Sequence, residues 1–137
     1  IAKNSKAKVV YGIEMNPLAH QYALNNVSLN KLDDKIAIFE GDVREILPKI
    51  KKKFDRIAMP LPKTGEQFLD IALSKVKLGG MIHLYAFLNE NEIEAEAKKV
   101  RDICKQNKHS VRILRKVKCG QFSPSVFRIC FDIKVIK

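Results

Sequence analysis

The sequence predicts an α/β protein with a doubly wound, mostly parallel sheet that ends in an antiparallel hairpin. Over most of the chain, short apolar runs alternate with segments of helical periodicity, and helices between buried strands imply parallel pairing with right-handed crossovers. The last strand alternates strictly between apolar and polar residues, which is typical of an antiparallel strand with one half-exposed face. The whole chain, residues 1–137, is expected to form one domain.

The first predicted strand is Lys8–Glu14, and it ends in a carboxylate. Asn16 is then expected to cap a helix that has Pro17 at its first position and runs to about Lys31. Several apolar side chains share one face of this helix and are expected to form its apolar side. They are Leu18, Ala19, Tyr22, Ala23 and Leu29.

The next two predicted strands end in polar or rigid segments. Ile36–Phe39 is closed by Glu40-Gly41-Asp42, and Val43–Ile50 is expected to be a short helix or turn. The apolar run Ile57-Ala58-Met59 stops at Pro60-Leu61-Pro62, because proline cannot donate to a sheet ladder. The two prolines stiffen a turn whose carbonyls point outward, at the carboxyl end of a strand, where open α/β sheets hold their ligands.

A further strand and helix follow this turn. Thr64 and Gln67 have the spacing of a capping box, which predicts the start of a helix. Gly79-Gly80 is expected to end this helix. The apolar residues of that helix are Phe68, Ala72 and Val76. Met81–Leu88 is expected to be a long apolar strand.

The last part of the chain is a helix followed by a hairpin. Glu90–Gln106 has acidic residues early and basic residues late, which suits a helix dipole. Val111–Lys118 and Val126–Val135 are expected to be the two antiparallel strands, joined by the loop Cys119–Ser125.

The chain carries a formal net charge of +11, which indicates a polyanionic partner, nucleic acid before an anionic membrane. A basic protein with no such partner is the alternative. No apolar run is long enough for a membrane span. Of the two polyanions, nucleic acid and not a membrane is the partner expected. The basic residues expected to meet RNA phosphates, if they are not simply a solvated face, are Lys49, Lys51, Lys52, Lys53, Lys63 and Lys118.

The cysteines predict neither a disulfide scaffold nor a metal site. Cys104, Cys119 and Cys130 are odd in number and widely spaced, and a reducing cytoplasm fits them best. A monomer is expected. The segment Ile1–Lys8 is interpreted as the tail of a helix and not as a signal peptide, so the chain is expected to begin partway through a larger protein.

Two carboxylates directly follow predicted strands. Glu14 is placed to accept hydrogen bonds from the two ribose hydroxyls of a nucleotide-like cofactor. Asp42, on the next strand, could accept from an adenine amine, with Met15 and Val43 as apolar faces for the ring. Each acid taken alone could instead be a turn or cap residue.

Five motifs occur in order along nearly the whole chain. They are Tyr11-Gly12-Ile13-Glu14-Met15-Asn16-Pro17, Gly41-Asp42-Val43-Arg44-Glu45, Asp55-Arg56-Ile57-Ala58-Met59-Pro60-Leu61-Pro62, Gly79-Gly80-Met81-Ile82-His83 and Phe122-Ser123-Pro124. In this combination the chain resembles the class I S-adenosylmethionine (SAM)-dependent methyltransferases, which have a Rossmann-like sheet. More closely, it resembles the catalytic domain of the archaeal and eukaryotic tRNA (guanine-37 N1)-methyltransferases.

The resemblance implies methyl transfer from SAM to N1 of guanosine 37 of a tRNA, with Pro60, Leu61 and Pro62 positioning the target base. It also marks two departures. The glycine-rich first motif that holds the methionine end of SAM in the family is missing, so weak cofactor binding is expected. Pro60 stands where the family usually has asparagine, a pattern associated with action on a tricyclic wyosine intermediate as well.

Guanine N1 carries a proton near neutral pH, so the reaction needs a general base. The sequence identifies none: Asp55 is expected before its strand, at the wrong end, and Glu45 has no support. His20 and His83 are expected to be structural, and His109 to be a solvated turn residue.

Two other functions stay open. A relative of the same fold transfers the aminocarboxypropyl group of SAM in wybutosine synthesis, although Leu61-Pro62 favours methyl transfer. A non-catalytic RNA-binding module that kept the methyltransferase fold is the alternative from another class.

Overall fold

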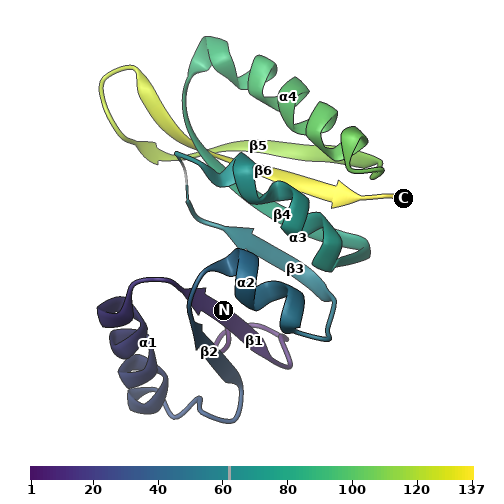
Figure 1. Cartoon of the computed structure of the whole chain (residues 1–137). Coiled ribbons are helices and arrows are strands. Elements are labelled where there is room, and N and C mark those ends of the chain that lie inside the picture. Colours follow the sequence, from purple (N-terminus) through teal and green to yellow (C-terminus); the bar gives the residue numbers. More distant parts are fainter. Residues whose placement is uncertain (62) are drawn as a thin grey trace. The chain divides into compact units, whose positions relative to one another are not determined.

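The computed structural model describes residues 1–61 and 63–137, so Pro62 lies outside the described residues. The chain forms two compact units, Ile1–Lys51 and Lys52–Lys137 (Figure 1). Each is described below by itself. In the described part of the chain, no helix combines the length and apolar character that a membrane span requires.

The first unit is built on a pair of parallel strands. β1 (Val10–Glu14) pairs with β2 (Ile36–Glu40) in a register that runs from Val10↔Ile36 to Glu14↔Glu40. The helix α1 (Pro17–Leu29) connects them, and α2 (Val43–Lys49) follows β2. Parallel pairing through a helical crossover confirms the prediction for this part of the chain.

The predicted start of α1 is confirmed. The Asn16 side chain accepts hydrogen bonds from the backbone N–H groups of Leu18 and Ala19, and Pro17 occupies the first helical position. The helix ends two residues earlier than expected, and Lys31 has φ 54°.

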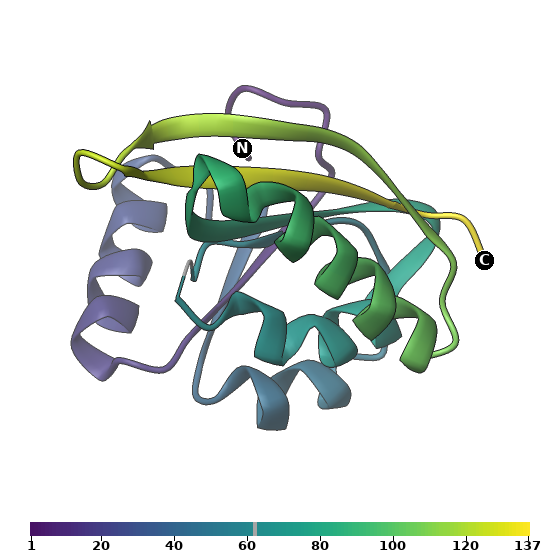
Figure 2. The same ribbon diagram turned by 90° about the horizontal axis from the view of Figure 1, so that it is seen from above.

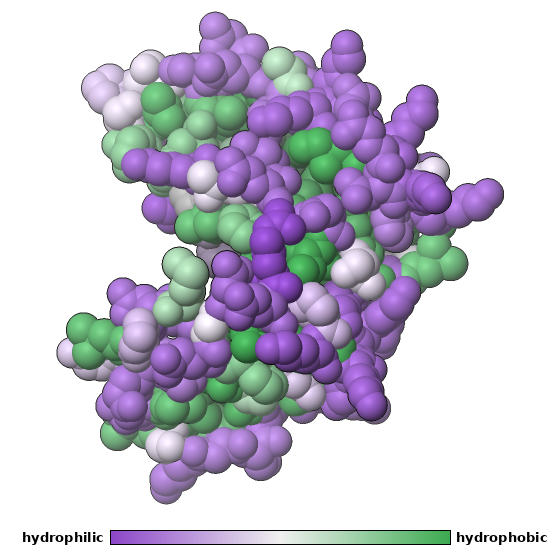
Figure 3. Space-filling model, in the orientation of Figure 1, coloured by the Kyte–Doolittle hydropathy of each residue, from purple (hydrophilic) through white to green (hydrophobic). Residues whose placement is uncertain are grey.

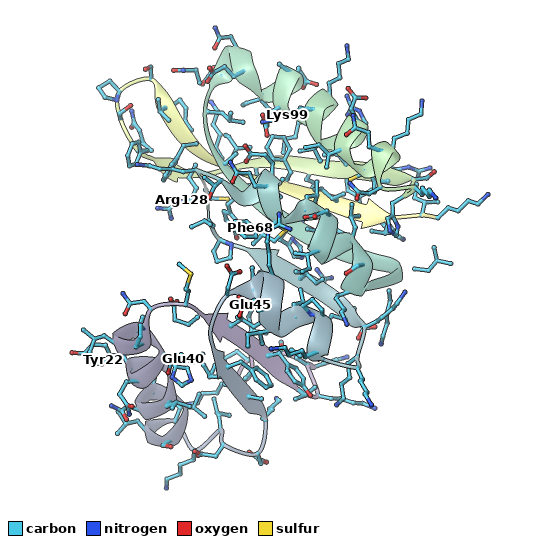
Figure 4. The ribbon with its side chains drawn as sticks, viewed as in Figure 1. Tyr22, Glu40, Glu45, Phe68, Lys99 and Arg128 are labelled. Carbon is cyan, nitrogen blue, oxygen red and sulfur yellow. The ribbon has the colours of Figure 1, made fainter. Side chains whose placement is uncertain are left out.

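The predicted apolar face of α1 is largely wrong. Leu18, Tyr22 and Leu29 are between 61% and 79% exposed, and Tyr22 projects away from the helix (Figure 4). Apolar residues lie on both sides of this helix, so their spacing does not decide which side packs on the sheet. Small side chains allow the closest approach, and the residues turned inward are Ala19, His20, Ala23 and Val27.

The second unit has a mixed, four-stranded sheet in the order β3-β4-β6-β5. β3 (Phe54–Met59) is parallel to β4 (Val76–Asn89). β6 (Val126–Val135) lies between β4 and β5 (Val111–Gln121) and is antiparallel to both. The predicted C-terminal antiparallel hairpin is therefore confirmed.

The helices of the second unit pack on one face of this sheet (Figure 2). α3 (Leu69–Lys75) follows a 3-10 turn, Gly65–Phe68, and α4 (Ile93–Gln106) follows a 3-10 turn, Glu90–Glu92. Both helices contribute to a core with the inward residues of the strands. Its largest fully buried side chains are Phe131, Leu69, Leu73, Ile82, Leu84, Ile129, Ile133, Val100 and Val135.

The region around Gly79-Gly80 differs from the prediction. The Thr64 side chain makes no cap hydrogen bond, α3 ends at Lys75, and β4 already begins at Val76. The two glycines therefore lie inside β4, where the register with β3 jumps from Phe54↔Val76 to Arg56↔Met81. A Cβ atom on Gly80 would lie 2.8 Å from Val76 Cγ2, 2.9 Å from the Lys77 carbonyl oxygen and 3.0 Å from the Asp55 carbonyl oxygen of β3, so only glycine fits there without a shift of its neighbours.

Candidate functional site

The two predicted cofactor acids lie at the same edge of the first unit. Glu14 and Asp42 are at the carboxyl ends of β1 and β2, and the Gly41 N–H donates to the Glu14 carbonyl oxygen at 3.0 Å. Gly41 has φ 133°, a backbone conformation that favours glycine. The structure thus brings the two carboxylates to adjacent strand ends, as the sequence predicted.

Each acid also has a local structural role. Glu14 Oε1 accepts from the Asn16 N–H at 2.8 Å, and Asp42 Oδ1 accepts from the Arg44 N–H at 2.8 Å as the cap of α2. These bonds use one oxygen of each carboxylate. A carboxylate that accepts a hydrogen bond from a backbone N–H is held in one orientation. This suits a group that must present its other oxygen to a ligand.

Met15 and Val43 directly follow the two acids. Met15 is exposed, and Val43 is half-buried at the first position of α2. The edge therefore offers carboxylate acceptors beside apolar surface. That combination fits a ribose and an adenine ring, so the residues at this edge are compatible with SAM.

Pro60 and Leu61 follow the carboxyl end of β3 within the second unit. Met59 is buried opposite Leu84 of β4, and the strand ends there, before Pro60 and the exposed Leu61. The predicted stop at Pro60 is confirmed. The prediction for Pro62 lies outside the described residues.

The two acids considered as a general base have different surroundings. Asp55 lies inside β3, and not before it as the sequence suggested, and it accepts from Lys77 Nζ at 2.9 and 3.0 Å. The hydrogen bond from Lys77 lowers the pKa of Asp55, which makes this carboxyl a poor base. Glu45 is exposed in the first turn of α2 (Figure 4).

The predicted phosphate-contacting lysines are at the surface. On the face drawn in Figure 3, hydrophilic side chains cover most of the visible area. Lys118 is already engaged, because its ammonium pairs with Glu90 and lies 4.5 Å from the centre of the Phe127 ring. The other exposed members of the set are Lys49, Lys51, Lys52, Lys53 and Lys63.

The sequence did not reveal a charge network on the sheet of the second unit. It lies on the face turned away from α3 and α4, which we call the far face. His83 Nδ1 is 2.7 Å from Asp132 Oδ1, and Arg115 Nε donates to Asp132 Oδ2 at 2.8 Å. Arg56 Nη1 is 3.0 Å from His83 Nε2, so one residue from each of the four strands takes part.

The donors and acceptors of this network define its protonation state. A guanidinium can only donate, so His83 Nε2 accepts from Arg56, and Nδ1 carries the proton that it donates to Asp132. Burial raises the pKa of Asp132, but the hydrogen bonds from His83 and Arg115 outweigh it and hold this pKa below its ordinary value. Asp132 is therefore an ionised carboxylate although it is buried.

Cys130 completes a set of three potential metal ligands with His83 and Asp132, whose ligand atoms lie within 4.8 Å of one another. Burial raises the pKa of the Cys130 thiol to about 11, so the thiol is protonated near neutral pH. The carboxylate and the imidazole are already held by two guanidinium groups. We therefore interpret the cluster as a charge network.

The remaining histidines have local environments. His20 is turned toward the sheet of the first unit, and its Nδ1 lies 3.2 Å from Glu40 Oε2. His109 follows α4, and its Nδ1 is buried without a hydrogen-bond partner among the described residues, which differs from the solvated residue that the sequence suggested. Cys104, Cys119 and Cys130 are free thiols.

The fold is the α/β fold of known methyltransferase structures. The crystal structure of Trm5b from Pyrococcus abyssi superposes with a TM-score of 0.83 at 30% identity, over 95% of this chain and 38% of that one. Methanocaldococcus jannaschii TYW2 in complex with AdoMet gives a TM-score of 0.87 at 27% identity, over 99% of this chain and 61% of that one.

The family model of the TRM5/TYW2 methyltransferase domain matches residues 1–114, and the chain belongs to this family. The tRNA (guanine(37)-N(1))-methyltransferase Trm5b of P. abyssi is 34% identical over 95% of this chain and 38% of its own length. The tRNA 4-demethylwyosine(37)-methyltransferase Taw21 of Saccharolobus solfataricus is 35% identical, over 94% of this chain and 46% of its own length.

A third relative is the tRNA(Phe) (4-demethylwyosine(37)-C(7)) aminocarboxypropyltransferase of M. jannaschii. It is 30% identical over 98% of this chain and 53% of its own length. The chain thus spans between 38% and 53% of the length of these three curated relatives.

Proposed function

We propose that the protein transfers the methyl group of SAM to N1 of guanosine 37 in a tRNA, in the cytoplasm and as a monomer. The observation that carries the proposal is that β3 ends at Met59, directly before Pro60 and the exposed Leu61, within a chain of the TRM5/TYW2 family. The similarity to Trm5b of P. abyssi supports the same reaction.

The first unit would hold the cofactor. Glu14 would accept hydrogen bonds from the ribose hydroxyls and Asp42 from the adenine amine, while Met15 and Val43 would contact the ring. Bound SAM supplies an electrophilic methyl group. The chain's own contribution at this edge is acceptors whose orientation is fixed by the hydrogen bonds from the Asn16 and Arg44 N–H groups.

The second unit would position the target base. Pro60 has no N–H, so it offers no amide hydrogen that would compete with a ligand for nearby carbonyl oxygens. The carbonyls of Pro60 and Leu61 can then accept hydrogen bonds from the exocyclic amine of guanine. Holding the base in a near-attack orientation lowers the entropic part of the barrier. None of these residues titrates, and Asp55 is paired with Lys77, so the turn positions the base without deprotonating it.

The partner would be tRNA. The net charge of +11 and the exposed lysines Lys49, Lys51, Lys52, Lys53 and Lys63 suit a phosphate backbone, and one solved structure of a relative is a complex of aTrm5 and tRNALeu.

A second candidate reaction has its own support. The TYW2 structure superposes with a TM-score of 0.87, and the M. jannaschii aminocarboxypropyltransferase is 30% identical. Transfer of the aminocarboxypropyl group would use the same cofactor edge but a different carbon of SAM. Leu61-Pro62, a feature of the methyl-transferring pattern, supports methyl transfer.

One experiment separates these reactions. The intact protein is incubated with a tRNA that bears either guanosine 37 or 4-demethylwyosine 37, and with SAM labelled either in the methyl group or in the aminocarboxypropyl carbons. The digested nucleosides are then analysed by mass spectrometry. We expect methyl label in 1-methylguanosine, and none with a transcript that carries adenosine 37. Label from the aminocarboxypropyl carbons alone, on the tRNA with 4-demethylwyosine 37, would contradict the proposal. RNA binding without transfer to either tRNA would favour a non-catalytic binding module.

A further inference from the structure

Two phenylalanines and an arginine gather at the carboxyl end of β4. The ring centres of Phe87 and Phe122 are 4.2 Å apart with their planes at 28°, which is a stacked pair. Arg128 lies directly opposite Phe87 on β6, and its guanidinium carbon is 5.8 Å from the centre of the Phe87 ring. We call these three residues the aromatic platform.

Phe122 is unusual among the phenylalanines of the chain. It is 59% exposed, and no other phenylalanine among the described residues is in the exposed class. One side of its ring stacks on Phe87, so its exposure represents aromatic surface that is available to a ligand. An exposed aromatic ring beside a cation is the composition of sites that bind unpaired bases.

The platform lies on the far face of the sheet, at the end of the sheet where Pro60 follows β3. Ile82, Leu84 and Ala86 of β4 point into the core with α3 and α4, so Phe87 points the opposite way. β3 and β4 are parallel, with Met59 opposite Leu84, so their carboxyl ends meet at one edge of the second unit. An open hollow at the same end of β4 is lined by Asn89, Glu90, Asn91, Pro124, Ser125 and Phe127.

We propose that Phe122, backed by Phe87, stacks on an unpaired base next to the target guanosine, and that Arg128 contacts the phosphate of that nucleotide. The inference rests on the proposed function, because it names the part of the tRNA, the anticodon loop, that the second unit holds. An RNA base fits better than an apolar protein segment, because the platform includes an exposed cation and the chain carries a net charge of +11.

The test uses the intact protein and two anticodon stem-loop RNAs, with 2-aminopurine on the 5′ or the 3′ side of the target guanosine. Stacking on Phe122 should quench the fluorescence of one of the two probes. Phe122→Leu should abolish the quenching and weaken RNA binding roughly tenfold, whereas Phe122→Tyr should preserve both. The control Leu78→Ala, an exposed apolar residue near the amino end of β4, should change neither.

The role of Arg128 is tested by the salt dependence of binding. Arg128→Gln should reduce the slope of log affinity against log salt by about 0.7 to 0.9, the value of one phosphate contact. The control Arg101→Gln, on the exposed surface of α4, should leave the slope unchanged.

The outcomes separate this inference from the proposed function. Methyl transfer without quenching of either probe, and with unchanged affinity of Phe122→Leu, would overturn the platform and leave the proposed function intact. Quenching without any methyl transfer would support the platform and contradict the proposed function. If Phe122→Leu lowered the stability of the protein but not its affinity for RNA, the ring would be covered by protein and the platform would be wrong.

Discussion

Replacing Asp132 by asparagine measures what the buried charge network contributes to stability. The hydrogen bond between His83 and Asp132 is 2.7 Å long, and the two side chains are only 21% and 6% exposed. A hydrogen bond to a charged group contributes about 1.5–3 kcal/mol. The Arg115 side chain is 73% exposed, so its pair with Asp132 adds less than about 1 kcal/mol. Asparagine keeps the shape and one acceptor, so we expect Asp132→Asn to reduce the free energy of unfolding by about 2 kcal/mol.

The assay is urea unfolding followed by circular dichroism, with Asp55→Asn as the matched control. Asp55 also pairs with a cation on the neighbouring strand, but its side chain is 83% exposed, so its loss should have a much smaller effect on the free energy of unfolding. A double-mutant cycle with His83→Gln should show a coupling of at least about 0.5 kcal/mol. Equal effects of the two asparagine substitutions, or additivity in the cycle, would refute the idea that the network is stabilising.

The same network has a predictable pH dependence. The pKa of Asp132 is lower in the folded protein than its ordinary value of 3.8, so the folded state binds the proton less readily than the unfolded state. The stabilisation is therefore fully present above pH 3.8 and is lost as the pH falls through the lower folded pKa. Wild-type stability should decline more steeply than that of Asp132→Asn in this acid range, and parallel curves would contradict the assignment.

Three further predictions concern the proposed function. Glu14→Ala should weaken SAM binding in the intact protein by roughly tenfold to a hundredfold in calorimetry, because a carboxylate that accepts from hydroxyls is lost, while Glu40→Ala should not; unchanged affinity would refute the ribose role. Pro60→Asn should retain methyl transfer to guanine and change any activity on the tricyclic wyosine intermediate; the same ratio of the two activities as in the wild type would remove this interpretation of Pro60. Affinity for tRNA should fall steeply with salt, and Lys51→Gln should make the slope shallower; a flat slope in the wild type would leave the net charge unexplained.

Several features of the fold follow from local chemistry and were predictable for that reason. Asn16 and Pro17 define the start of α1 through a cap and a fixed φ angle, and both act within one turn. Pro60 ends β3 because it lacks a donor. The alternation in Val126–Val135 predicted the hairpin because the period of two is a property of the strand itself.

The predictions that proved wrong concern features that depend on residues distant in the sequence. The buried side of α1 is selected by the sheet beneath it, and Leu18 and Tyr22 proved to be exposed. Gly79-Gly80 has the composition of a helix stop, but Gly80 lies inside β4, where a Cβ atom would meet the Asp55 carbonyl of the neighbouring strand as well as Val76 and Lys77.

Asp132 illustrates the same limit at the candidate site. Its place in the alternating strand predicted a half-exposed residue, but it is buried because His83 and Arg115 on the two neighbouring strands satisfy both of its oxygens. The partners are 49 and 17 residues away in the sequence. No local pattern encodes such a pairing. The positions of Glu14 and Asp42 at the carboxyl ends of neighbouring strands were predictable, because Glu14 ends β1 and Asp42 follows β2 as the cap of α2.

The far face of the second unit suggests how the proline turn is held in place. Three cross-strand pairs lie side by side on β4 and β6: His83↔Asp132, Tyr85↔Cys130 and Phe87↔Arg128. The first pair anchors β3, because Arg56 binds His83 only four residues before Pro60. The last pair, Phe87↔Arg128, lies at the end of the sheet where Pro60 follows β3. The network therefore restrains β3 directly before Pro60, the residue that we propose to position the target base. Substitutions in the network should act on stability and on the rate with every substrate alike, whereas substitutions of Pro60 should change the preference between substrates.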